Sequence, residues 1–230
     1  MTYIIAEAGT GHFADDGLES ERLAVSFIGA AKNAGANAVK FQMFRPHEPL
    51  FCPMPGDDKR FERWDKTYIQ LSRWKLLKQM ADEMKIDLLW SAFQPTCIEW
   101  LKELKPRYVK VASRAARTFP YWWDGNDGQF IVSGDFDVSN ESNYHLQCVP
   151  QYPTPLEKCG FDHELYDGLS DHSGTIWPGL DAIFHGAKFL EVHFKIPGAD
   201  MGNDEPVCLT VDQLKLLCDA RDANAQMHPA

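Results

Sequence analysis

The stretch FLEVHF (residues 189–194) decides how the fold is to be understood. Side chains alternate between the two faces of a β-strand, so Leu190, Val192 and Phe194 share one face. Glu191 and His193 share the other. A parallel strand that is covered by helices on both sides is almost entirely apolar, and this one is not. We therefore expect its apolar face to meet helices and its charged face to point into an enclosed interior.

The rest of the chain alternates strand-like and helix-like segments. Helical periodicity and glycine or proline stops separate these segments. Eight such units in 230 residues are typical of a (β/α)8 TIM barrel, a single α/β domain over residues 1–230. A doubly wound open sheet is the alternative, but no turn carries the G-x-G-x-x-G phosphate motif. The expected strands are 3–9, 38–44, 86–93, 107–113, 128–134, 145–153, 168–172 and 189–196.

Two connections depart from a regular barrel. The segment DFDVSNESNY (135–144) follows the fifth strand and is too short for a crossover helix of the usual length. We therefore expect a trimmed barrel in which this helix is reduced or missing. The proline-rich segment RPHEPLFCPMPGDD (45–58) follows the second strand and is not expected to form regular structure.

Charged residues recur on other expected strands. Glu7 lies in IIAEAG, Lys40 in AVKFQ and Lys110 in YVKVAS, each opposite apolar neighbours. Charges inside a barrel must pair with one another, with a ligand or with a metal ion. An internal network of salt bridges without chemistry is one reading of the pattern. The other is an active site at the carboxyl ends of the strands, where two inward lysines suit an anionic substrate.

Two histidines end consecutive expected strands. His172 closes GLSDH and His193 lies in FLEVHF. Because neighbouring strands lie about 4.8 Å apart, both imidazoles could reach one divalent cation. Asp171 and Glu191 add carboxylates nearby, and the loop that carries Asp204 could close over the site. Two ordinary packed histidines remain the alternative.

Serines also recur at the expected strand ends. Hydroxyls and loop amides at the mouth of a barrel are suited to binding phosphate, although any single serine there is usually a turn residue. The four serines are Ser91, Ser113, Ser133 and Ser170.

Composition narrows the class of protein. The formal net charge is −10 and no basic block occurs, which argues against a nucleic-acid partner. The six cysteines are scattered and form no C-x-x-C motif, so we expect reduced thiols in a cytoplasmic protein. The N-terminus enters a strand directly, without a signal peptide, and no apolar stretch is long enough to span a membrane.

Several of these segments together resemble the sialic acid (N-acetylneuraminate) synthase family. IIAEAGTGH (4–12) resembles its first-strand motif, AGANAVKFQMF (34–44) its second and YVKVAS (108–113) its fourth. QYPTP (151–155) and GLSDHSG (168–174) match closely. GAKFLEVHF (186–194), followed by GNDEPVCLTVDQL (202–214), resembles the last strand, loop and helix.

The resemblance implies a transferase of carbohydrate biosynthesis with small-molecule substrates. Phosphoenolpyruvate would condense with an amino-sugar aldehyde to give a 2-keto-3-deoxy (nonulosonic-type) sugar acid and phosphate. Mn²⁺ or Mg²⁺ would be held by His172 and His193. The implied catalytic residues are Glu7, Lys40, Lys110 and Glu191. The phosphoenolpyruvate-binding residues are Lys40, Ser91, Lys110, Ser113, Ser133 and Ser170. Residues expected at the acceptor or its loop are His12, Gln42, Asp171 and Asp204.

Two departures from the family pattern bear most directly on function. Ala115 stands where the family usually has a glutamate, and the sequence ends at Ala230 without the family's C-terminal antifreeze-like domain, which bears on the homodimer expected for the family. Two alternatives to a synthase stay open. One is a degenerate barrel that only binds a ligand or a partner protein, and the other is an aldolase that forms a Schiff base with Lys110 or Lys40.

Overall fold

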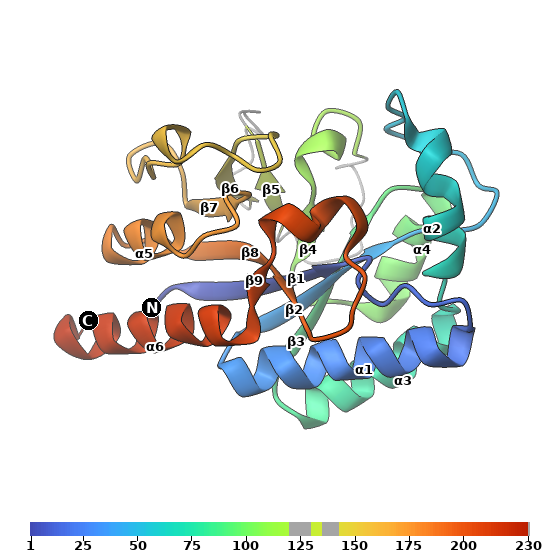
Figure 1. Ribbon diagram of the computed structural model, residues 1–230, viewed down its shortest axis with the longest axis horizontal. Helices are drawn as coiled ribbons and strands as arrows, with labels where there is room; N and C mark the ends of the chain where they lie inside the picture. Colours follow the sequence, from blue (N-terminus) through green and yellow to red (C-terminus); the bar gives the residue numbers. More distant parts are fainter. Residues whose placement is uncertain (120–129, 135–142, 230) are drawn as a thin grey trace.

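A closed barrel of parallel strands organises the chain (Figure 1). The computed structural model describes residues 1–119, 130–134 and 143–229. Each strand pairs with the next along the chain, and β8 pairs with β1 to close the barrel, which confirms the predicted TIM-barrel class. The barrel strands are β1 (Tyr3–Gly9), β2 (Ala38–Met43), β3 (Asp87–Ala92), β4 (Val109–Val111), β5 (Phe130–Ser133), β6 (Asn143–Cys148), β7 (Gly168–Asp171) and β8 (Phe189–Lys195).

Helices cover the outer faces of the strands (Figure 1). Asp16 caps the N-terminus of the first helix by accepting from the Leu18 amide, and Gly35 ends that helix at a φ of 92°. Thr210 and Gln213 form a reciprocal capping box at the start of the last helix. The α-helices are α1 (Gly17–Ala34), α2 (Phe61–Lys66), α3 (Leu71–Glu83), α4 (Pro95–Leu104), α5 (Trp177–Phe184) and α6 (Val211–Met227).

The barrel interior has an apolar layer near the amino ends of the strands. Successive inward side chains on a strand are two residues apart, so the next inward layer lies one step closer to the carboxyl ends. That second layer is polar on every strand. The apolar layer contains Ile5, Ala38, Leu89, Tyr108, Ile131, Leu146 and Phe189. The polar layer two residues further along contains Glu7, Lys40, Ser91, Lys110, Ser133, Cys148, Ser170 and Glu191.

Gly168 of β7 has no inward side chain for a physical reason. A Cβ atom there would lie 2.1 Å from the carbonyl oxygen of Phe189 and 2.9 Å from a methyl group of Leu146. Only glycine therefore allows β7 to approach its neighbours closely, and this brings Ser170 and Glu191 into register. The packing of the apolar layer thus sets the spacing of the polar layer above it.

The connections differ in part from the sequence-based expectation. The proline-rich segment ends in a 3-10 turn, η1 (Asp57–Arg60), that leads directly into α2. Two further 3-10 turns, η2 (Ser113–Ala115) and η3 (Leu156–Lys158), follow β4 and β6. The loop after β8 contains η4 (Gly202–Val207) and a short strand that was not expected, β9 (Leu209–Thr210), which pairs with β8.

The shortened crossover expected after the fifth strand falls mainly on residues 135–142, which lie outside the described residues. Elsewhere in the described chain, none of the helices combines the length and the apolar character needed to cross a bilayer.

Candidate active site

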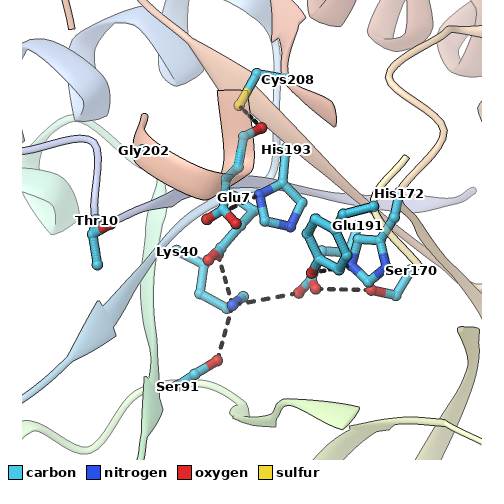
Figure 2. A network of polar contacts seen from close by, with 12 residues as sticks. Glu7, Thr10, Lys40, Ser91, Ser170, His172, Glu191, His193, Gly202 and Cys208 are labelled. Carbon is cyan, nitrogen blue, oxygen red and sulfur yellow. Dashed lines mark hydrogen bonds and ion pairs between the residues drawn. The ribbon is translucent and has the colours of Figure 1, made fainter. Parts of the chain in front are cut away.

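A network of buried charges occupies the polar layer of the barrel (Figure 2). The ammonium group of Lys40 lies 2.6 Å from Glu7 Oε2, 2.9 Å from the Ser91 hydroxyl and 3.8 Å from Glu191 Oε2. Lys110 lies 3.5 Å from Glu191 Oε1. These side chains come from five different strands. The charges expected on alternating strand positions therefore meet in one place.

The pKa values of the two glutamates of this network are shifted in opposite directions. Burial outweighs the attraction of Lys40 and raises the pKa of Glu7 to about 7. Burial acts in the same direction on Glu191, but Lys110 and Lys40 outweigh it and lower the pKa of Glu191 to about 2. Glu191 is thus a fixed anion between two lysines, whereas Glu7 can exchange a proton near neutral pH.

The two lysines also differ. Burial opposes the charge on Lys40, but Glu191 and Glu7 more than compensate and raise its pKa. Burial dominates at Lys110 and lowers its pKa. Lys110 donates to the Ser133 hydroxyl over 2.7 Å and to the Val111 carbonyl over 3.2 Å. Lys40 is therefore a cation that its neighbours stabilise, whereas an additional anionic partner would stabilise the charged form of Lys110.

The strand-end hydroxyls lie where the serine pattern placed them. Ser91 and Ser133 accept from the two lysines, and Ser170 donates to Glu191 Oε1 over 3.0 Å. Ser113 begins η2 directly after β4, and its Cβ lies 3.8 Å from the position that a Cβ on Gly134 would take. Lysines and hydroxyls thus line the same part of the mouth. Such a surface suits a ligand that carries phosphate and carboxylate groups.

His172 and His193 lie side by side at the mouth, with ring centroids 5.3 Å apart. Both side chains are buried, and burial lowers the pKa of each to about 4. Both imidazoles are therefore neutral at neutral pH, the form that binds metal ions. His193 Nδ1 has no hydrogen-bond partner in the described structure and lies 3.7 Å from Asp204 Oδ2.

This arrangement fits a metal site in which the protein supplies only some of the ligands better than one in which it supplies all of them. Among the described residues, no group of three or more His, Cys, Asp or Glu side chains is arranged to hold a metal ion. Two neutral imidazoles with one nearby carboxylate nevertheless match the ligand preferences of first-row divalent cations. A buried imidazole nitrogen without a partner is costly unless something binds it. Any cation held here would take its remaining ligands from substrate or water.

Gly9 allows Asp204 to approach the network. Gly9 ends β1 at a φ of +56°, and a Cβ there would lie 2.9 Å from Asp204 Oδ2 and 3.5 Å from Gln42 Nε2. Glu7 Oε1 would lie at the same 3.5 Å. Gln42 and Asp204 therefore border the charged network. Both the backbone conformation and the close approach require glycine.

Arg63 of α2 links two loops of the mouth. Its Nε donates to the Thr10 hydroxyl over 2.7 Å, and one terminal nitrogen donates to the Thr10 carbonyl over 3.0 Å. The same guanidinium donates to the Asp200 carbonyl and lies 3.1 Å from Asp200 Oδ1. A Cβ on Gly202 would lie 2.9 Å from it. Arg63 therefore fixes the loop that carries Asp204 onto the loop after β1.

His12 and Asp171 do not face the charged network. His12 packs against the rings of Phe41 and Trp74, outside the barrel, and its Nε2 lies 2.9 Å from the Thr67 carbonyl oxygen. The Asp171 carboxylate turns back on its own loop and accepts from the amide and hydroxyl of Ser173, each over 2.9 Å. Asp171 alternates with Ser170 and His172, so its side chain leaves the barrel on the helix side.

Two side chains at the site were given no role by the sequence analysis. Tyr152, in the QYPTP segment, places its hydroxyl 2.8 Å from His172 Nε2. The Cys148 thiol lies 3.8 Å from His172 Nδ1. Strand alternation in HLQC, which puts Cys148 on the same face as Leu146, would have found the cysteine. The tyrosine follows the end of β6, where alternation no longer applies.

At the position where the family usually has a glutamate, Ala115 is buried and offers no polar group. Its neighbour Arg114 turns away to the proline-rich segment. The Arg114 guanidinium makes two contacts with Asp57, at 3.1 and 2.7 Å, and donates to the Cys52 carbonyl over 2.8 Å. Arg114 therefore anchors that segment to the end of β4.

The barrel, with ionisable groups from many strands at the carboxyl ends, defines a (β/α)8-barrel enzyme. The chain belongs to the NeuB family, whose family model matches residues 27–123 and 137–228. The resemblance to sialic acid synthases is thereby confirmed, and with it the expectation of a C–C bond-forming enzyme of that type.

Individual relatives are distant but extensive. An N,N'-diacetyllegionaminic acid synthase of Campylobacter jejuni is 25% identical over 94% of this chain and 74% of its own length. The spore coat polysaccharide biosynthesis protein SpsE of Bacillus subtilis is 29% identical over 94% of this chain and 66% of its own. The crystal structure of an N-acetylneuraminic acid synthetase from Leptospira borgpetersenii superposes with a TM-score of 0.78, at 22% identity, over 100% of this chain and 85% of that one. This last similarity supports the fold.

Proposed function

We propose that this chain catalyses the condensation of phosphoenolpyruvate with an amino-sugar aldehyde. The products are a 2-keto-3-deoxy sugar acid of the nonulosonic type and inorganic phosphate. The observation that carries the proposal is the meeting of two lysines, four strand-end serines and two neutral histidines in one mouth, next to Glu7 and Glu191. Relatives named as synthases of legionaminic, pseudaminic and N-acetylneuraminic-acid-9-phosphate products support this class of product.

The lysines and serines would hold the anionic groups of phosphoenolpyruvate. Lys110 has the lowered pKa and gains most from an anionic ligand, because burial opposes its charge. Lys40 is held in place by Glu7 and Glu191. Fixed cations and hydroxyls that surround a developing negative charge stabilise it without reorganisation.

The reaction forms one C–C bond and one C–O bond, the latter from water, and breaks one C–O bond to phosphate. The methylene carbon of phosphoenolpyruvate attacks the aldehyde carbon, the oxygen of a water molecule adds to the neighbouring carbon, and phosphate departs from that carbon. Glu7, with a pKa of about 7, is suited to accept the proton of that water. The aldehyde oxygen becomes a hydroxyl by taking up a proton, so the overall reaction consumes one water.

His172 and His193 would hold Mn²⁺ or Mg²⁺ on the aldehyde side, next to Gln42 and Asp204. When bound, the cation would act as a Lewis acid toward the aldehyde oxygen. The imidazoles would supply two neutral nitrogen ligands, and a cation held there, beside Glu191, would bring the aldehyde close to phosphoenolpyruvate bound by the lysines.

Phosphate release tests the proposal. Protein, Mn²⁺ and phosphoenolpyruvate are mixed with a panel of aldoses and N-acetylated amino sugars, with Lys110→Met as the matched inactive control. Release that depends on an aldose is the expected result. No release with any aldose, together with no binding of phosphoenolpyruvate, would favour a barrel that only binds a ligand or a partner.

The lowered pKa of Lys110 also keeps a Schiff-base aldolase as a second candidate. Borohydride trapping in the presence of pyruvate distinguishes the two. A stable adduct on Lys110 would favour the aldolase, whereas the metal-assisted condensation leaves none.

A further inference from the structure

Tyr152 contacts the nitrogen of His172 that a metal ion would need. His172 Nδ1 lies 3.0 Å from the Val149 carbonyl oxygen, which can only accept a hydrogen bond. Nδ1 therefore carries the proton of the neutral ring, and Nε2 carries the lone pair. The Tyr152 hydroxyl lies 2.8 Å from that Nε2 and must be the donor.

The ring of Tyr152 lies against both histidines. Tyr152 stacks on His172 at a centroid distance of 4.2 Å and meets the edge of His193 at 5.9 Å. A tyrosine hydroxyl of ordinary acidity is protonated at neutral pH, so it can donate this hydrogen bond. The side chain as a whole is 45% exposed.

We propose that Tyr152 is a positioning residue that blocks the metal-binding lone pair of His172 until a divalent cation displaces its hydroxyl. This inference rests on the proposed metal site at His172 and His193. One lone pair cannot accept a hydrogen bond and bind a cation at the same time. When no cation is bound, the hydroxyl would satisfy a buried nitrogen that would otherwise have no partner.

The proposal predicts the sign of a mutational effect. Competition by the hydroxyl lowers the apparent affinity for the cation, because only the fraction of molecules with a free Nε2 can bind. Tyr152→Phe keeps the ring and its stacking but removes the competing donor. Mn²⁺ should therefore bind Tyr152→Phe about two- to tenfold more tightly than it binds the wild type, in the absence of substrate. A tyrosine that merely supported the site would produce the opposite change or none.

The experiment is a titration of metal-free protein with Mn²⁺, in which electron paramagnetic resonance reports the free ion. Tyr144→Phe is the matched control, because Tyr144 packs in the apolar layer at the other end of the barrel and should leave the affinity unchanged. Thermal unfolding confirms that each variant is folded. A crystal structure with Mn²⁺ should show the Tyr152 hydroxyl outside hydrogen-bonding distance of His172 Nε2.

The outcomes separate this inference from the function on which it rests. Wild-type binding of Mn²⁺ with equal or weaker binding by Tyr152→Phe overturns the role of the tyrosine and leaves the metal site standing. No binding by either protein overturns the metal site itself, and the inference with it. Tighter binding of Mn²⁺ by Tyr152→Phe than by the wild type supports both the metal site and the role of the tyrosine.

Discussion

Replacing Glu191 with glutamine removes the central anion of the buried network. Glu191 lies 3.5 Å from Lys110 and 3.8 Å from Lys40, and both lysines are almost completely buried. Glutamine has nearly the same shape but leaves two buried ammonium groups with Glu7 as their only anionic neighbour within ion-pair distance in the described structure. We therefore expect Glu191→Gln to destabilise the fold.

The size of the loss follows from the pKa of Glu191, which falls from 4.5 to about 2 in the folded protein. A difference of about 2.5 pKa units corresponds to roughly 3 kcal/mol of unfolding free energy. For a chain of this length the melting temperature should fall by about 6–12 °C. Because the folded pKa is depressed, this contribution is fully present above about pH 4.5 and is lost as the pH falls toward 2.

Thermal and denaturant unfolding at pH 7, 5 and 3, followed by circular dichroism, measure the change. Glu205→Gln is the control, since its partner Lys195 and Glu205 itself are 35% and 48% exposed. An exposed pair contributes no more than about 1 kcal/mol, so this control should change little. A loss below about 1 kcal/mol for Glu191→Gln, or one that does not shrink between pH 5 and pH 3, would refute the assigned role of Glu191.

Two further substitutions test the loops of the mouth. Gly9→Ala should destabilise the fold by about 1–2 kcal/mol, because Gly9 has a positive φ and an added Cβ would press on Asp204. Gly29→Ala is the control: an added Cβ there would meet open space in α1, so the change should be neutral or slightly stabilising. Arg63→Ala should raise KM for the aldehyde more than KM for phosphoenolpyruvate and speed hydrogen exchange in the loop after β8. Arg73→Ala, which removes an ion pair with Glu21 on the outside of the barrel, should do neither.

Strand alternation alone located most of the buried network. Lys40, Lys110 and Glu191 each stand between apolar neighbours on a strand, so the period of two determines the face on which they lie. Since the carboxyl ends of parallel strands meet at one mouth of a barrel, these residues had to come together. Their separation from the apolar layer below follows from the same period.

The loops could not be predicted in this way. Arg63, Thr10 and Asp200 meet only because helix α2 and two loops come together at the same mouth, and no local pattern encodes that contact. His12 illustrates the converse error. It follows a strand end, where a polar residue can reach the mouth, but the chain turns outward and buries the ring between helices and sheet.

Binding of phosphoenolpyruvate to Mn²⁺-loaded protein, measured by calorimetry, tests the central claim most directly. The proposed site predicts one phosphoenolpyruvate bound per chain in the wild type and about 10- to 100-fold weaker binding by Lys110→Met. Lys195→Met, at a half-buried position whose ammonium group pairs with Glu205, should bind like the wild type. No binding by the wild type, or equal binding by Lys110→Met, would contradict the proposal that the lysines of the barrel mouth hold this substrate.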